Sequence, residues 1–393
     1  MRQVLLTDYG NNDLPGEMPG LFKRAGCAVD VYCAKRSWLR KNHSFDAWLP
    51  AEPDPKNYAD RLCALADSGK YDWIVLTDDE SLRVARDFVD DGHFAKILPL
   101  LHAQDRDLLG SKAVLSRRAA ACGITTPPFA VYTGTTSIME LAEEVSYPLF
   151  LKVDESSSGA GVFLCRTAAE LRLTFAKLKD HKKRNLVLQK QIMGDIVCVE
   201  ALYKRGELIA AAHSRVLTTL HDAFGVSSSR EYVADELHRA ELERIGSAFR
   251  LNGFCSYTFI REKGSGAQYL IEADLRTHGW FAYSRHAGTD FAVAIRDYLE
   301  DTRTPEHQAS GPVLIPHFSR SIEGALIRGD IRELVAWACN KGDRWRFVTP
   351  DRRLIFATLS AIARRHVHRT LPYRFWTRLK RKARAMKDLR AAY

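Results

Sequence analysis

The stretch from Tyr269 to Gly279 spaces two acids and an arginine two residues apart, at Glu272, Asp274 and Arg276. In a β-strand, residues two apart point to the same face, so these three side chains would stand next to one another. The opposite, buried face would hold Ile271, Ala273 and Leu275. Adjacent carboxylates repel each other unless a cation lies between them, and oxygen ligands suit Mg²⁺. Because a neighbouring arginine can hold a phosphate or a carboxylate with two hydrogen bonds, the spacing predicts a metal and anion site. The alternative is an edge strand whose charges face water.

A loop rich in small residues supplies a second group of candidate ligands. The loop Asp154-Glu-Ser-Ser-Ser-Gly-Ala-Gly161 connects two predicted strands, and its backbone N–H groups and hydroxyls can surround a phosphate. Lys152 lies on the preceding strand and adds a positive charge at the same end. The alternative is an ordinary hairpin loop beside a surface lysine.

The segment Gln189–Asp195 follows an apolar strand and carries a third group. An extended segment of this kind can hydrogen-bond the edge of an adenine, and its acid can bind a ribose. The alternative is a plain exit from a strand into a turn.

These groups need elements that position them. Short apolar runs at 4–7, 28–32 and 73–76 alternate with helical patterns, which is typical of a parallel sheet covered by helices. The last of these runs ends in Asp78-Asp79-Glu80, and such sheets often bind ligands at the carboxyl ends of their strands. A domain boundary is predicted near residue 105, and the strands at 256–261 and 269–276 form a hairpin across the Gly264-Ser-Gly266 turn.

The overall composition limits the class of protein. At 393 residues the chain is long enough for two or three domains, and its apolar and charged fractions are ordinary for a globular protein. No window approaches the ~18 apolar residues of a membrane span, and the first residues form too short an apolar run for a signal peptide. The eight cysteines show no paired spacing, which favours reduced core thiols over disulfides or a zinc site. These features predict a cytoplasmic location.

Taken in order, the three groups resemble the motifs of the ATP-grasp superfamily. The resemblance covers residues 1–310, includes Lys112, and is strongest to carboxylate–amine ligases of the carbamoyl-phosphate-synthetase-like and D-alanine–D-alanine-ligase-like type. It implies an α/β plus α+β fold. A parallel α/β domain would occupy 1–107, an ATP-grasp domain of two α+β subdomains 108–310, with a lid at about 118–187, and a helical basic region 311–393.

The resemblance also implies roles for the motif residues. Glu272 and Asp274 would bind Mg²⁺, and Arg276 would hold the transferred phosphoryl group or the acyl phosphate. Lys112 and Lys152 would contact the α- and β-phosphates. The predicted catalytic residues are Arg276 and Lys152. The remaining ATP ligands would be Ser157, Ser158, Gly159, Gly161, Gln189, Lys190, Ile192 and either Asp195 or Glu200. On the substrate side, Arg230 would grip a carboxylate and His278 would transfer a proton, although a lone histidine is more often structural.

Two departures from the family pattern bear on catalysis. The family carries asparagine where this chain has Asp274, which still offers an oxygen ligand. It also carries an acid on the preceding strand, near Ser256-Tyr-Thr258, where this chain has none. The second departure puts a second Mg²⁺ in question, and with it full catalytic competence.

The function implied by the resemblance is that of a ligase. ATP would phosphorylate a carboxylate, and an amine or a thiol would displace phosphate from the acyl phosphate. The missing acid keeps open a second hypothesis, a nucleotide-binding adaptor without turnover, and a carboxylase that uses bicarbonate is a third. The substrates would be small or carrier-bound carboxylates and amines, and a homodimer is compatible with the sequence.

The net charge of +10 lies in the last part of the chain. From Ala361 onward there are eleven basic residues and one acid, whereas the remainder is neutral. Apolar residues recur every three or four positions in this tail, at Trp376, Leu379, Ala383, Met386 and Leu389. The pattern fits a helix on an anionic membrane, such as the inner face of the cell membrane, or a dock for an acidic carrier protein. It fits equally a helix that packs on the protein's own body. Nucleic acid is disfavoured because no reading motif accompanies the charge.

Overall fold

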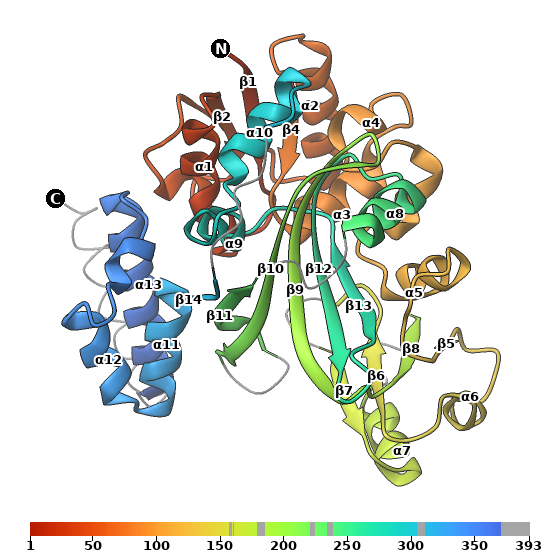
Figure 1. The fold of residues 1–393 in the computed structure, drawn as a ribbon. Helices are drawn as coiled ribbons and strands as arrows, with labels where there is room; N and C mark the ends of the chain where they lie inside the picture. Colours follow the sequence, from red (N-terminus) through yellow and green to blue (C-terminus); the bar gives the residue numbers. More distant parts are fainter. Residues whose placement is uncertain are drawn as a thin grey trace, which may run out of the picture.

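The computed structural model describes residues 1–156, 159, 161–178, 185–220, 225–233, 239–304 and 311–370. These residues form three β-sheets with helices packed against them, followed by a group of helices near the end of the chain (Figure 1). The N-terminal sheet lies at one end of the long central sheet, and the four-stranded sheet that contains β6 and β7 lies toward the other end (Figure 1).

The first sheet is parallel, with the strand order β3-β2-β1-β4. Its strands are β1 (Gln3–Thr7), β2 (Ala28–Cys33), β3 (Ala47–Pro50) and β4 (Trp73–Leu76), and its helices are α1 (Met18–Arg24), α2 (Pro55–Asp67), α3 (Asp79–Phe88) and α4 (Phe94–Ile97). β2 is buried throughout, as expected of a parallel strand covered on both faces. Helices α2 and α3 begin where Asp54 and Asp78 accept hydrogen bonds from backbone N–H groups of the first turn.

The second sheet is small and antiparallel, with the order β5-β8-β6-β7. It consists of β5 (Phe129–Tyr132), β6 (Leu149–Val153), β7 (Val162–Cys165) and β8 (Leu186–Lys190), with helices α6 (Ile138–Val145) and α7 (Ala168–Lys177). Leucines from β6 and β8 pack against these helices and form a separate hydrophobic core. The sheet therefore has a hydrophobic core of its own, and its role as a lid remains a prediction.

The third sheet is antiparallel and has six strands in the order β13-β12-β9-β10-β11-β14. Its strands are β9 (Gly194–Lys204), β10 (Glu207–Thr219), β11 (Ser227–Val233), β12 (Gly253–Glu262), β13 (Gln268–Asp274) and β14 (Val313–Pro316). The associated helices are α5 (Lys112–Ala121), α8 (Arg239–Phe249), α9 (Trp280–Tyr283) and α10 (Phe291–Glu300). One face of the sheet shares a core with α8 and the other shares a core with α10 and the N-terminal sheet.

The hairpin of β12 and β13 is confirmed, with one correction to its buried face. The register passes from Thr258 opposite Glu272 to Phe259 opposite Leu270, so Ile271 is an extra residue in the ladder. Because such a bulge shifts the alternation, Leu270 and not Ile271 joins the core below β13. Glu272 and Asp274 remain on the opposite face, as the spacing predicts.

The chain after residue 310 begins with a strand. β14 pairs with β11 and completes the large sheet, and three helices follow: α11 (Phe318–Arg328), α12 (Ile331–Ala338) and α13 (Arg352–Thr370). Trp38 packs against Leu354 and Ala361 of α13, which joins these helices to the N-terminal sheet. The predicted tail helix with its apolar stripe from Trp376 onward lies outside the described residues.

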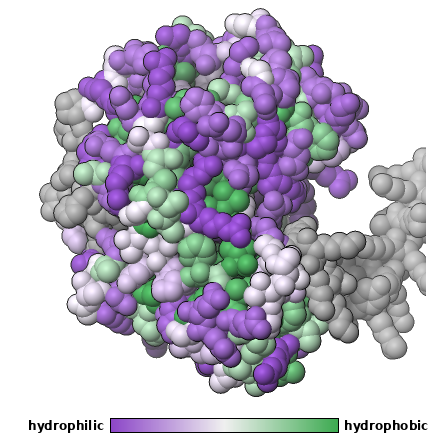
Figure 2. All heavy atoms as spheres, turned by 90° about the vertical axis from the view of Figure 1, so that its right-hand side faces the viewer, coloured by the Kyte–Doolittle hydropathy of each residue, from purple (hydrophilic) through white to green (hydrophobic). Residues whose placement is uncertain are grey.

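The fold class predicted from the sequence is confirmed: a parallel α/β unit precedes two antiparallel α+β units. The apolar pattern does not predict β3, β5, β11 and β14, because three of them are only four residues long and β11 is rich in serine. Among the described residues, none of the helices combines the length and the apolar character that a bilayer crossing requires. Seen from the right-hand side of Figure 1, the surface is mostly hydrophilic, with small hydrophobic areas toward its middle (Figure 2).

Candidate active site

The polar face of the large sheet carries two rows of facing side chains. Glu272 on β13 lies opposite Thr258 on β12, and Thr258 lies opposite Cys198 on β9. One step along, Asp274 lies opposite Ser256, which lies opposite Glu200. The strand pairing thus places hydroxyls, not carboxylates, directly across from Glu272 and Asp274. The two residues directly across from these acids are therefore Thr258 and Ser256.

The carboxylates of β13 fit a divalent cation. Burial raises the pKa of Asp274 to about 7; nearby Glu272 and Asp79 also raise it, whereas Arg276 lowers it. A cation beside these carboxylates would offset both the burial and the repulsion. Glu272 and Asp274, with the Thr258 hydroxyl across the ladder, are the oxygen donors that could hold Mg²⁺.

Arg276 is buried and is held by an acid from the N-terminal unit. Its guanidinium donates two hydrogen bonds to Asp79 at the start of α3, one of them at 3.0 Å from Nη2, and a third at 3.3 Å to Asp274. The pair joins the carboxyl end of the parallel sheet to the strand that carries the predicted metal ligands. Sequence reasoning did not assign Asp79, although its place after β4, at the carboxyl edge of a parallel sheet, is a signal for a ligand-facing residue.

Lys152 lies on β6 of the small antiparallel sheet, and its side chain reaches the same site. Its side chain is 8% exposed, and Nζ donates a hydrogen bond of 2.6 Å to Oε1 of Gln189 on the neighbouring strand β8. Burial lowers the pKa of Lys152 to about 8, while the charge of Glu272 raises it and that of Lys112 lowers it. The lysine of the small sheet and the acid of the large sheet therefore lie close enough to influence each other. Gln189, predicted to hold adenine, is 2% exposed and instead supports Lys152 with its side chain.

The affinity for MgADP should depend on the charge of Lys152. The protonated amine attracts phosphates, so affinity should be full below the pKa of about 8 and fall as pH rises through it, by up to about tenfold per pH unit. Lys152→Arg keeps its charge at high pH and should flatten the profile. Calorimetric titration with MgADP between about pH 7 and pH 9.5 measures this. A wild-type affinity that stays constant over this range would contradict the prediction.

The base of the predicted phosphate loop is tied to α5. Asp154 accepts hydrogen bonds from the Ser111 hydroxyl at 2.9 Å and from the Lys112 backbone N–H at 2.7 Å. This arrangement brings the Lys112 side chain to the backbone carbonyl of Ser156. Lys112, Lys152 and the loop are therefore brought together, as the resemblance implies.

The loop itself is described in part. Gly159 and Gly161 both have positive φ, and a Cβ on Gly161 would lie 3.0 Å from Cβ of Val153. Glycine is thus required at Gly161 for both conformation and space. Ser157 and Ser158, predicted to close over the triphosphate, lie outside the described residues.

The predicted adenine and ribose segment links the two antiparallel sheets. Lys190 is fixed at the end of β8, since its Nζ donates to the Ser146 hydroxyl at 2.9 Å and the Tyr147 carbonyl at 2.8 Å. Ile192 is half-buried and Asp195 is exposed. Their roles toward a nucleotide remain predictions.

Glu200 and Arg230 do not have the surroundings expected of a ribose ligand and a free carboxylate grip. They form a buried ion pair of 2.6 Å, and Arg230 also lies over the Trp280 ring, 4.4 Å from its centroid. Nε2 of His278 lies 3.9 Å from the same carboxylate. Burial and the neighbouring Arg230 and Arg276 hold the pKa of His278 well below its usual value. His278 is therefore neutral near pH 7, and its part in proton transfer remains a prediction.

Removal of Arg230 should destabilise the fold. Arg230→Met leaves Glu200 buried without its partner, which costs about 3–5 kcal/mol of unfolding free energy. Replacing both residues, with Glu200→Leu added, should recover most of the loss. Arg244→Met, which breaks an exposed pair with Glu241, is the control and should cost less than about 1 kcal/mol. Denaturant titrations measure all three, and equal losses for Arg230→Met and Arg244→Met would refute the prediction.

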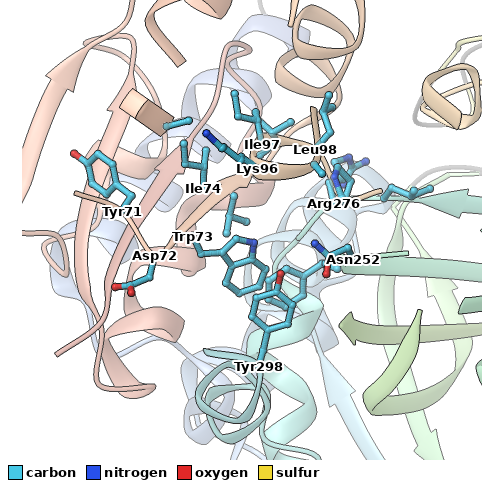
Figure 3. A pocket seen from close by; sticks show the side chains of 18 residues that line it. Tyr71, Asp72, Trp73, Ile74, Lys96, Ile97, Leu98, Asn252, Arg276 and Tyr298 are labelled. Atoms are coloured by element: carbon cyan, nitrogen blue, oxygen red, sulfur yellow. The ribbon is translucent and has the colours of Figure 1, made fainter. Parts of the chain in front are cut away.

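A cavity of about 280 Å³ lies between β4, the end of α4 and the base of the hairpin. Figure 3 shows Trp73 beside Tyr298, with Asn252 next to Tyr298 and Arg276 above Asn252 in the view. Trp73 and Tyr298 stack with their ring centroids 4.1 Å apart. Arg276 is the one residue that this cavity shares with the polar site, since its lining includes neither Lys152 nor the β13 acids. The cavity is thus a separate space behind Arg276 and not the nucleotide site.

Comparison with known proteins places this geometry in a known fold. No family model matches the chain, and no curated protein matches it in sequence. Solved structures match it well. The biotin carboxylase domain of 2-oxoglutarate carboxylase from Hydrogenobacter thermophilus, solved with MgADP and bicarbonate, has a TM-score of 0.62 at 16% identity, over 80% of this chain and 73% of that one.

Two further structures are similar. N5-carboxyaminoimidazole synthetase from Staphylococcus aureus has a TM-score of 0.62 at 15% identity and covers 84% of this chain and 86% of its own. L-amino acid ligase from Bacillus licheniformis has a TM-score of 0.56 at 16% identity, over 76% of this chain and 74% of that one. At these identities the likeness shows the fold.

Proposed function

We propose that this chain, which has the ATP-grasp fold, is an ATP-dependent ligase that activates a carboxylate as an acyl phosphate and joins it to an amine or a thiol. The observation that carries the proposal is that Lys152 of the small sheet, and Arg276 with its partner Asp79 of the N-terminal unit, converge on the acids of β13 in the large sheet. The structural relatives solved with ADP support ATP as the nucleotide.

The proposed reaction has two steps. A carboxylate oxygen attacks the γ-phosphorus of ATP, the bond to the β-phosphate oxygen breaks, and ADP leaves. The amine nitrogen then attacks the acyl carbon, phosphate leaves with the electrons of the acyl–oxygen bond, and the amine proton passes to solvent. The protein contributes positioning and charge, because phosphoryl transfer needs little covalent help.

The side chains divide this work between them. Lys112 and Lys152 would place positive charge at the phosphates, and closure of the small-residue loop would exclude water. Arg276, aligned by Asp79, would neutralise charge that grows on the phosphoryl oxygens. Glu272 and Asp274 would hold Mg²⁺, which supplies further charge neutralisation when bound.

Hydroxylamine trapping tests the proposal directly. The full chain is incubated with Mg²⁺, ATP, hydroxylamine and pools of amino, hydroxy and dicarboxylic acids. The proposal predicts one acid that gives ADP and its hydroxamate in equal amounts. Protection of the fold by MgATP without ADP release from any pool would instead establish a binding adaptor, which the hydroxyl of Thr258 opposite Glu272 motivates.

Bicarbonate is the substrate of the second candidate function. The structural relative solved with MgADP and bicarbonate motivates it. Phosphate release that needs bicarbonate, and that gives no hydroxamate from any organic acid, would favour a carboxylase.

We further propose that the basic segment after Thr370 binds an anionic membrane surface. The support is its charge and its apolar repeat. Flotation of residues 1–393 with anionic liposomes, and not of residues 1–370, is the expected result. Equal flotation of the two chains would remove the membrane role.

A further inference from the structure

Four side chains with metal-binding chemistry meet on the N-terminal unit, away from the site described above. Cys63 and Asp67 lie one turn apart on α2, and Asp90 and His93 lie in the turn between α3 and α4. Ligand atoms of Cys63, Asp90 and His93 all lie within 4.8 Å of one another. The two elements therefore bring a thiol, a carboxylate and an imidazole to one point.

The separations suit a small cation. Sγ of Cys63 lies 3.9 Å from Oδ2 of Asp90, and that oxygen lies 2.7 Å from Nδ1 of His93. Ligand atoms bound at about 2.0–2.3 Å to one tetrahedral ion lie about 3.3–3.8 Å apart, so an ion would replace the hydrogen bond between Asp90 and His93 and move these two atoms slightly apart. Sulfur and nitrogen donors with one oxygen favour Zn²⁺ over Mg²⁺ or Ca²⁺.

The other nitrogen of His93 is also occupied. Oδ2 of Asp67 lies 2.8 Å from Nε2, and Lys96 holds the second oxygen of Asp67 at 3.1 Å. A carboxylate on the far nitrogen is the arrangement that orients a metal-bound histidine and fixes its tautomer. In an ion-pair cluster of His93 with the two aspartates, the thiol of Cys63 would do no more than donate a weak hydrogen bond to Asp90.

We propose that Cys63, Asp90 and His93 bind a Zn²⁺ ion, with Asp67 as the residue that positions His93. The ion would link α2 to the turn before α4. Ala66 of α2 and Lys96 of α4 line the cavity described above, and Figure 3 labels Lys96 there. The proposal is independent of the ligase function, since none of these residues belongs to the ATP site.

Cobalt binding tests the site, because a cobalt–thiolate bond has its own absorption band. The full chain is stripped of metal under reducing conditions and titrated with Co²⁺ in excess Mg²⁺, which blocks oxygen-only sites. We expect one equivalent of Co²⁺ to produce the band and Zn²⁺ to abolish it. Cys63→Ser should lose the band, and Asp67→Asn should keep it while weakening Zn²⁺ binding about 10- to 100-fold. Cys339→Ser removes an exposed thiol elsewhere and should match the wild type.

Thermal unfolding separates loss of the site from loss of the fold. In chelator, Cys63→Ser and the wild type should unfold at the same temperature, and Zn²⁺ should raise only that of the wild type and of Cys339→Ser. Absence of the band in the folded wild type, or its persistence in Cys63→Ser, would overturn the proposal.

Discussion

Arg276→Met should lower the rate of ADP formation by about 10³-fold or more, while MgADP affinity stays within a few-fold of the wild type. The guanidinium lies beside the β13 acids and is buried, so its charge acts in a site of low polarity. Arginines that stabilise phosphoryl transfer contribute about 10³–10⁵-fold, chiefly in the transition state. Steady-state ADP release and calorimetry measure the two quantities. Arg244→Met, on the exposed face of α8, is the control and should change neither.

The partner of Arg276 offers a graded version of the same test. Asp79→Asn keeps one hydrogen-bond acceptor but loses the charge that faces the guanidinium, so a smaller loss of about 10- to 100-fold in kcat is expected, again with little change in MgADP affinity. Asp79→Glu restores the negative charge and should recover part of the lost kcat. An Arg276→Met variant with near-normal turnover would show that the arginine is only a structural link between the two units.

Glu272→Gln should lower turnover by about 10²- to 10³-fold at saturating ATP and raise the Mg²⁺ concentration needed for half-maximal rate. The amide keeps the shape and one oxygen but removes a negative charge, so the site loses much of its attraction for a cation. It also removes a charge that raises the pKa of Lys152, and nucleotide affinity should therefore begin to fall at a lower pH. Turnover at graded Mg²⁺ concentrations measures the effect.

The control for this variant is Glu241→Gln, which lies on α8 and pairs with Arg244 at the surface. It should leave the Mg²⁺ dependence unchanged. An unchanged Mg²⁺ requirement in Glu272→Gln would exclude the β13 acids as the metal site.

The parts of the site that lie on one strand could be predicted from the sequence. The alternation at Glu272, Asp274 and Arg276 depends only on the period of a β-strand, and it is preserved beyond the bulge at Ile271. The position of the missing acid could also be located, because hairpin register places Thr258 and Ser256 across from the two acids. The strand period and the hairpin were sufficient to locate both stretches, but the bulge at Ile271, which sets the pairing residue by residue, could not be predicted.

The parts that depend on contacts between units could not be predicted. Asp79 lies 197 residues from Arg276, and Glu200 lies 30 residues from Arg230, so no local spacing signals either pair. In the sequence, a carboxylate that forms a buried ion pair with an arginine, as Glu200 does, cannot be distinguished from a carboxylate that binds a ribose. The cluster of Cys63 and His93 likewise joins two elements, and scattered cysteines favoured simple core thiols.

The most direct measurement is a crystal structure of the full chain with a non-hydrolysable ATP analogue and Mn²⁺ in place of Mg²⁺. The account predicts an anomalous peak bound by Glu272 and Asp274 at about 2.2 Å, with the triphosphate between that ion, Lys152 and Arg276. A bound nucleotide with its metal elsewhere, or with Lys152 and Arg276 turned away from its phosphates, would contradict it.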